Sequence, residues 1–188
     1  MAAAAAWLMA GSAMAGAFGV EMGTPLSQLR DAKLFNGSGP VKNYSITVPQ
    51  PNAEFSRYVV GLTPETGVCS LVGFGRLYPN DGYGTTVISS YQRLRTALIA
   101  KYGPPISEDE VPPDTLSNGD SSFAVSIFRR ERKVTVKWKL NDGPDDVAAL
   151  ALLITSDATN ATSVMIAYGF RNKDICDRIS VQGDSTGF

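Results

Sequence analysis

The side chains that most often perform chemistry in proteins are scarce in this sequence. It has 188 residues, two cysteines and no histidine. Histidine is the usual general base at neutral pH, the commonest metal ligand and the common pH switch. The chain also lacks a phosphate-binding glycine loop, a Ser-x-x-Lys pair and a Cys-x-x-Cys motif. We therefore expect no catalytic residues, no metal site and no cofactor.

Carboxylates are the remaining candidates for catalysis. Two acidic side chains that converge in a cleft can hydrolyse a glycoside. The candidates are Glu21, Glu54, Glu65, Asp81 and Asp109, and the sequence offers no way to pair them. A cryptic carboxylate-dependent hydrolase therefore stays an alternative. Asn80 and Asp81 also suggest calcium binding, but the ligand spacing of an EF-hand is absent, and a tight turn before a helix explains them better.

Six basic side chains gather around one predicted strand. They are Arg129, Arg130, Arg132, Lys133, Lys137 and Lys139. On an outer sheet face they form a basic strip that can bind an acidic protein, lipopolysaccharide phosphates or a lipid headgroup. The alternative is a solvent-facing lysine row that keeps the sheet soluble and discourages edge pairing. The net charge of −1 gives no global attraction for nucleic acid, so we expect no such partner.

Cys69 and Cys176 are far apart in the sequence. In an oxidising compartment we expect them to form a disulfide. The bond would close a loop of roughly 100 residues and stabilise the fold by roughly 4–5 kcal/mol through loop-closure entropy. Two unpaired buried thiols, which behave as small apolar side chains, are the alternative.

The first 20 residues contain no charged side chain. The apolar stretch leads into Ala13-Met14-Ala15, which fits the A-x-A cleavage pattern and predicts a signal peptide over residues 1–15. No Lys or Arg precedes the stretch, which departs from the usual pattern. An uncleaved anchor is the alternative, although a stretch this rich in alanine and glycine makes a poor membrane-spanning helix. We expect a periplasmic or secreted protein without a stable membrane span after cleavage.

The elements that must position these side chains follow from hydrophobic periodicity. Apolar residues at helical spacing predict a helix from Val87 to Tyr102, capped by Thr85 or Thr86 and ended by Gly103. A short helix is expected to open at Thr24-Pro25, and a last helix after Asn172. Strands are predicted at 44–48, 57–62, 68–74, 123–127, 134–140, 147–155 and 163–170. The segment 147–155 is alanine-rich, so a helix is an alternative there.

This order predicts an α+β fold, in which helices pack on one face of an antiparallel sheet. A proline-rich acidic loop at 106–120 separates residues 16–105 from residues 121–188. Two similar α-β-β-β halves within one compact domain are one arrangement that this order allows. The support is a short echo between residues 28–32 and 93–97.

Several stretches together resemble a known group of proteins. They are residues 18–29, 58–69 (which hold Thr63-Pro64, Gly67 and Cys69), 80–84 and 98–104. Over roughly residues 18–105 the chain resembles small uncharacterised exported proteins of Gram-negative bacteria. The resemblance implies a periplasmic α+β domain and nothing about catalysis. By layout alone the chain also resembles β-lactamase inhibitor proteins and small outer-membrane assembly lipoproteins, although it lacks the lipoprotein cysteine.

We therefore expect an exported, non-enzymatic protein that binds another envelope protein, as an accessory or inhibitor-like protein. Two alternatives stay open beside it. One is the carboxylate-dependent hydrolase, and the other is a carrier of a small ligand or lipid, which requires an apolar cavity between helix and sheet.

Overall fold

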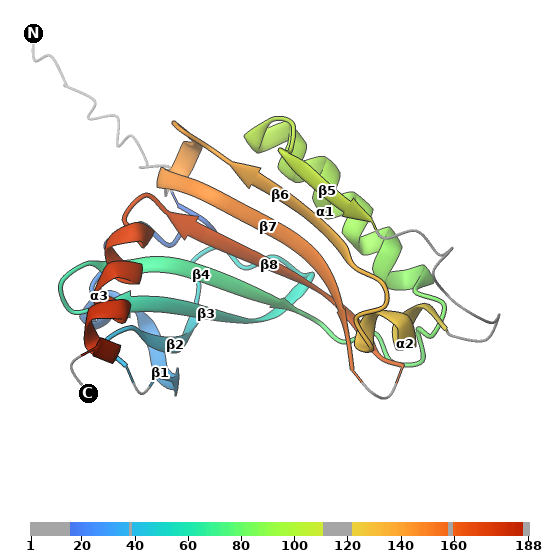
Figure 1. Ribbon diagram of the computed structural model, residues 1–188, viewed down its shortest axis with the longest axis horizontal. Coiled ribbons are helices and arrows are strands. Elements are labelled where there is room, and N and C mark those ends of the chain that lie inside the picture. Colours follow the sequence, from blue (N-terminus) through green and yellow to red (C-terminus); the bar gives the residue numbers. More distant parts are fainter. Residues whose placement is uncertain (1–15, 38, 111–121, 158–159, 186–188) are drawn as a thin grey trace, which may run out of the picture.

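The computed structural model describes residues 16–37, 39–110, 122–157 and 160–185. The predicted signal peptide and most of the predicted 106–120 loop lie outside these residues. The described part folds around one antiparallel sheet of eight strands in the order β1-β2-β3-β4-β8-β7-β6-β5 (Figure 1). The strands are β1 (Arg30–Asn36), β2 (Lys42–Thr47), β3 (Phe55–Thr63), β4 (Gly67–Gly75), β5 (Ser107–Glu110), β6 (Val134–Lys139), β7 (Val147–Ser156) and β8 (Thr162–Phe170). The predicted α+β class with an antiparallel sheet is confirmed.

The helices are α1 (Thr85–Tyr102), α2 (Phe123–Phe128) and α3 (Lys173–Ser185). Two single turns of 3₁₀ helix, Leu26–Gln28 and Pro144–Asp146, precede β1 and β7. β4 pairs with β8, so the sheet joins strands from both predicted halves of the chain. Strands close in sequence form hairpins, whereas this central pairing joins segments that are far apart in the sequence.

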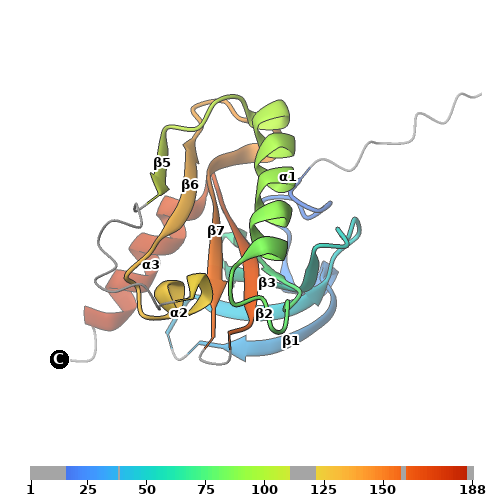
Figure 2. The ribbon, with the colours of Figure 1, turned by 90° about the vertical axis from the view of Figure 1, so that its right-hand side faces the viewer.

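The two faces of the sheet differ in what covers them. Alternation along β7 directs Leu150, Leu152 and Ile154 toward α1, and all three are buried. We call this the inner face. Figure 2 shows α1 lying across β7 and β8 on this side, while α3 lies behind the sheet. The opposite side is the outer face, and α3 covers only one end of it.

The helix α1 begins where its sequence predicts, but its cap differs from the prediction. Its N-cap is Gly84, in the left-handed conformation, rather than a threonine. The carboxylate of Asp81 accepts the backbone N–H groups of Thr86 and Val87 at 3.0 Å each. Asp81 thus satisfies two free donors of the first turn, and Gly103 ends the helix as predicted.

Two further segments differ from the sequence-based prediction. Residues 123–127 form the helix α2 rather than a strand, because the Ser122 side chain caps the segment at the N–H of Val125. Residues 107–110, expected to be loop, form the edge strand β5, which pairs with β6 from Ser107–Lys137 to Glu110–Val134. Their backbone partners decide the structure, since β5 has no apolar pattern of its own.

At the N-terminal end, the helix expected at Thr24-Pro25 is only the single turn Leu26–Gln28. The chain then enters β1, a strand that the sequence did not predict. β1 is irregular, with register shifts against β2, and six of its seven residues are exposed. It therefore shows little of the apolar alternation that identifies a strand.

The predicted disulfide between Cys69 and Cys176 is confirmed. It joins β4 to α3, and both cysteines are buried. Asn172, just before α3, donates hydrogen bonds to the carbonyls of Thr66 and Val68 at 3.1 Å. Together these contacts hold α3 against one end of β4. Within the part of the chain that is described, no helix is long and apolar enough to cross a bilayer.

Candidate functional site

The outer face carries rows of mainly small and apolar side chains, two of which end in lysines. Strand pairing places directly opposed residues on the same face, so the register defines these rows. One row runs through Val59, Val72, Ala167, Ala151 and Lys137, and the next through Gly61, Ser70, Gly169, Ala149 and Lys139. A third row contains Arg57, Phe74, Met165, Leu153 and Thr135. The outer face of the central strands is therefore largely uncharged up to its border at β6.

These rows form the floor of an open groove. The groove has a volume of about 610 Å³ and is lined mainly by apolar atoms. Its lining includes Val72, Ala151, Ala167, Lys137, Lys139 and Lys173. A side chain at Gly169 would approach the Lys173 side chain to 2.9 Å, so the start of α3 borders the floor closely. Cationic side chains thus stand on two sides of an apolar floor.

The predicted basic strip does not lie on a single strand face. Lys137 and Lys139 are exposed on the outer face. Arg129 and Arg130 lie instead at the end of α2, and the guanidinium carbon of Arg132 lies 5.0 Å from the centre of the Phe123 ring. The amine of Lys133 lies 3.0 Å from the Asp109 carboxylate. The structure therefore divides the six residues between the outer groove and the connection from α2 to β6.

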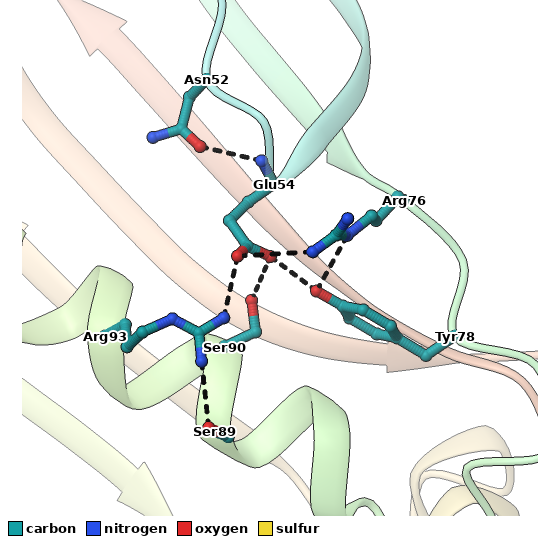
Figure 3. Close-up of polar contacts among 7 residues, drawn as sticks. All are labelled: Asn52, Glu54, Arg76, Tyr78, Ser89, Ser90 and Arg93. Atoms are coloured by element: carbon teal, nitrogen blue, oxygen red, sulfur yellow. Dashed lines mark hydrogen bonds and ion pairs between the residues drawn. The ribbon is translucent and has the colours of Figure 1, made fainter.

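The densest polar cluster in the described chain surrounds Glu54, just before β3 (Figure 3). Its carboxylate accepts hydrogen bonds from Ser90 at 2.5 Å, Tyr78 at 2.6 Å and Arg93 at 2.8 Å. Arg76 completes the cluster at 3.8 Å. The carboxylate side chain is 16% exposed, whereas both arginines are more than half exposed. The cluster ties α1 to the ends of β3 and β4.

Glu54 is poorly suited to act as a general base. Burial alone would raise the pKa of its carboxyl, but hydrogen bonds from Ser90, Tyr78 and Arg93 and the charge of Arg76 lower that pKa to about 2. A carboxylate with so low a pKa binds a proton weakly at neutral pH. A general acid needs the opposite shift. The geometry therefore fits a structural anion that is held by its neighbours.

Other carboxylates with shifted pKa values follow the same pattern. Burial favours the neutral form of Asp81, but hydrogen bonds from Thr162 and from the start of α1 keep its pKa low. Burial acts the same way on Asp145, where a hydrogen bond from Lys101 outweighs it and lowers the pKa. The hydrogen bond and charge of Lys133 lower the pKa of Asp109. Each of these carboxylates is stabilised as an anion.

Of the remaining hydrolase candidates, Glu21 and Glu65 are exposed. Among the described residues, no group of three or more acidic or cysteine side chains is arranged to hold a metal ion. Asp81 serves as a cap for α1, so the local geometry agrees with a turn before a helix. Comparison with models of protein families, with curated proteins and with solved structures finds no match to this chain.

Neither the outer groove nor the Glu54 cluster is directly indicated by the sequence. The groove needs the register between β4 and β8, which joins residues near 70 to residues near 168. One local signal was present, because Ala149 and Ala151 alternate with the larger Leu150 and Leu152 on β7. Small side chains on one face of a strand allow another chain or a ligand to approach that face closely.

Proposed function

We propose that this protein is an exported, non-enzymatic binding protein that receives an acidic amphipathic helix of another envelope protein on its outer face. The observation that carries the proposal is the apolar groove with Lys137, Lys139 and Lys173 at its margins. The lysines offer complementary charge to acidic side chains, and the floor offers apolar contact to the opposite side of the same helix.

The dimensions of the groove support a helix as the occupant. Four neighbouring strands, β4, β8, β7 and β6, span about 14 Å at the usual strand spacing. An α-helix with its side chains is about 10–12 Å wide. Small residues such as Ala151 and Ala167 let the helix approach the sheet closely, as α1 does on the inner face. A helix on each face would complete a three-layer arrangement.

The ion pairs that these lysines make also favour an anionic partner. Lys139 has no ion pair with any residue that the structure describes, and Lys137 lies 3.6 Å from Asp109, which also pairs with Lys133. Lys173 is paired with Asp177 one helical turn away. Charge on this margin is thus incompletely compensated by the described residues, and a partner carboxylate near Lys139 would compete with none of their carboxylates.

Two observations support the other parts of the proposal. The Glu54 cluster and the lowered pKa values of Glu54, Asp81 and Asp145 agree with a non-enzymatic protein. The buried disulfide is compatible with an oxidising compartment, which agrees with export to the periplasm. N-terminal sequencing of the protein from its native cell tests export. A mature terminus at Gly16 is expected, and recovery of an uncut chain in the cytosol would contradict it.

Site-specific photo-crosslinking in intact cells tests the docking face. A photoreactive side chain replaces Ala149, exposed on the outer face, and in a matched variant replaces Ala97, exposed on α1. We expect an adduct from position 149 alone. The adduct should disappear when Lys137 and Lys139 are both replaced by glutamate, because the charge attraction then becomes repulsion.

Mass spectrometry of the crosslinked peptide identifies the occupant. An acidic, amphipathic sequence from a different protein is the expected result. A second copy of this chain or a lipid at position 149 would refute the proposed partner. Equal adducts from positions 149 and 97, or an adduct that survives the double lysine replacement, would refute the docking face.

A further inference from the structure

A second hollow opens where α2 leads into β6, beyond the end of the outer groove. Its volume is about 550 Å³. Its lining combines three cations with apolar side chains: Arg130, Arg132, Lys133, Ile127, Phe128 and Leu153. No lining residue is shared with the groove proposed for the partner helix. The hollow therefore requires its own explanation.

The guanidinium groups of Arg130 and Arg132 line this hollow and have no ion pair with a described residue. Lys133 is already paired with Asp109 at 3.0 Å. Arg132 stacks against the Phe123 ring, and its Nε is buried without a hydrogen-bond partner among the described residues. Arg130 is exposed and has no ion pair within the described chain. Arginine presents several donors in a planar fork that matches the oxygens of a phosphate.

The backbone conformation at Arg130 is one that arginine rarely adopts. Arg130 follows the C-cap of α2 and has φ of +62°. Glycine or asparagine is strongly favoured at such a left-handed position, because other side chains are strained there. An arginine here stabilises the fold less than a glycine would. A contribution of its guanidinium to ligand binding would account for an arginine at this position.

The apolar side of the hollow indicates that the ligand also has a hydrocarbon part. Phe128 is 51% exposed and stands beside the two arginines. Leu153 and Ile127 continue the apolar wall. A free phosphate ion would leave these side chains in water, whereas an alkyl chain attached to the phosphate would cover them.

We propose that this hollow binds a phosphate-headed amphiphile. The phosphate lies between Arg130 and Arg132, and the alkyl chain contacts Phe128 and Leu153. Such a ligand reaches the site either as a lipid within a bilayer or as a single molecule. Both sources present the same chemistry to the protein, and the experiment separates them.

Calorimetric titration of the full chain with dodecyl phosphate, below its micelle concentration, tests the site. We expect saturable binding of one molecule. Arg130→Gly should weaken binding at least tenfold, while glycine suits the backbone and preserves the fold. Arg129→Gly is the matched control, because it removes the same charge one residue away, outside the hollow. It should change the affinity less than twofold.

Two further ligands separate the contributions of the phosphate and of the alkyl chain to binding. Dodecyl maltoside, with the same chain and no charge, and inorganic phosphate, with no chain, should each bind at least tenfold more weakly than dodecyl phosphate. Vesicles of phosphatidylglycerol, compared with phosphatidylcholine, reveal the source. Cosedimentation that requires Arg130 identifies a bilayer lipid, and its absence identifies a monomeric amphiphile.

The proposal would be overturned by any of three results. These are no binding of dodecyl phosphate, equal affinities of the two glycine variants, or equal affinities for dodecyl phosphate and dodecyl maltoside. Because the hollow and the groove share no residues, these results leave the crosslinking test of the partner helix unaffected.

Discussion

The Glu54 cluster and the basic margin of the outer face use the same kinds of side chain in opposite ways. Around Glu54, two arginines, a tyrosine and a serine all direct donors to one carboxylate. Lys139 on the outer face and Arg130 just after α2 have no ion pair with any described residue. The first arrangement is complete among the described residues, whereas the charges of the second are left for the partners that we propose.

This difference distinguishes charges that stabilise the fold from charges that can bind a partner. A buried carboxylate must be paired, because an uncompensated buried charge is costly. An exposed lysine or arginine is solvated and needs no internal partner. Unpaired cations beside an apolar surface therefore indicate a binding site more strongly than the Glu54 cluster does, because the charges of that cluster already pair with one another.

Removal of the disulfide that holds α3 should have the largest effect on stability. The disulfide joins residues 107 positions apart, so its removal restores considerable freedom to the unfolded chain. Replacing Cys69 and Cys176 by alanine should lower the free energy of unfolding by about 4 kcal/mol. Urea denaturation measures this loss, and the wild type under reducing conditions is the control. A stability insensitive to both treatments would show that α3 is held by other contacts.

Neighbouring residues of β7 test the division between the two faces. Leu152 is fully buried on the inner face, so Leu152→Ala should cost about 3 kcal/mol through lost contacts and a cavity. Ala151 is half-buried on the outer face, and Ala151→Leu should change stability by less than about 0.5 kcal/mol. Urea unfolding of both variants measures the two changes in the free energy of unfolding. Similar costs at the two positions would mean that the outer face is also packed within the fold.

The Glu54 cluster should make stability depend on acid pH. The pKa of Glu54 falls from 4.5 to about 2 on folding, so the anion stabilises the fold above about pH 4.5. This contribution disappears as pH falls toward 2. Glu54→Gln should therefore cost about 2 kcal/mol at pH 7, after allowance for solvent screening of the exposed arginines.

Unfolding of Glu54→Gln and the wild type across pH 2–7 measures this contribution. The difference between the two proteins should shrink as pH falls through the window from 4.5 to 2. Glu65→Gln, at an exposed position, is the control and should show no comparable convergence. A difference independent of pH would show that the cluster does not depend on the Glu54 anion.

Replacement of Arg130 should have a smaller effect than loss of the Glu54 anion, and the effect should be a gain in stability. Arg130→Gly removes the strain of a left-handed arginine and should raise the free energy of unfolding by about 0.5–1 kcal/mol. The entropy of the more flexible unfolded chain opposes part of this gain. Thermal unfolding measures it. A clear loss of stability would mean that the Arg130 side chain supports the fold rather than a ligand.

The sequence predicted those parts of the fold that local patterns determine. β6 was recognised by the alternation of Val134, Val136 and Trp138 with polar residues, and the β3–β4 hairpin by its turn. In contrast, Phe123 and Ile127 fit both a strand and a helix, since two-residue alternation also places them four apart. The Ser122 cap decides for the helix. β5 depends entirely on pairing with β6, which no local pattern shows.

The candidate sites were less predictable because they combine distant segments. The sequence indicated that Lys137 and Lys139 share a strand face, but the floor beside them comes from β4, β7 and β8. Glu54 meets Arg93 only because the end of β3 lies beside α1. Long-range register determines both arrangements, and hydrophobic periodicity does not specify register between strands that are far apart in the sequence.

The most direct test of the separation between folding and binding is to measure the Ala149 crosslink in an Ala151→Glu variant, together with its free energy of unfolding. The added carboxylate on the outer floor should repel an acidic helix, while the half-exposed position tolerates the change. We predict that the adduct is lost and that stability changes by less than about 1 kcal/mol. An undiminished adduct in the folded variant would contradict the account.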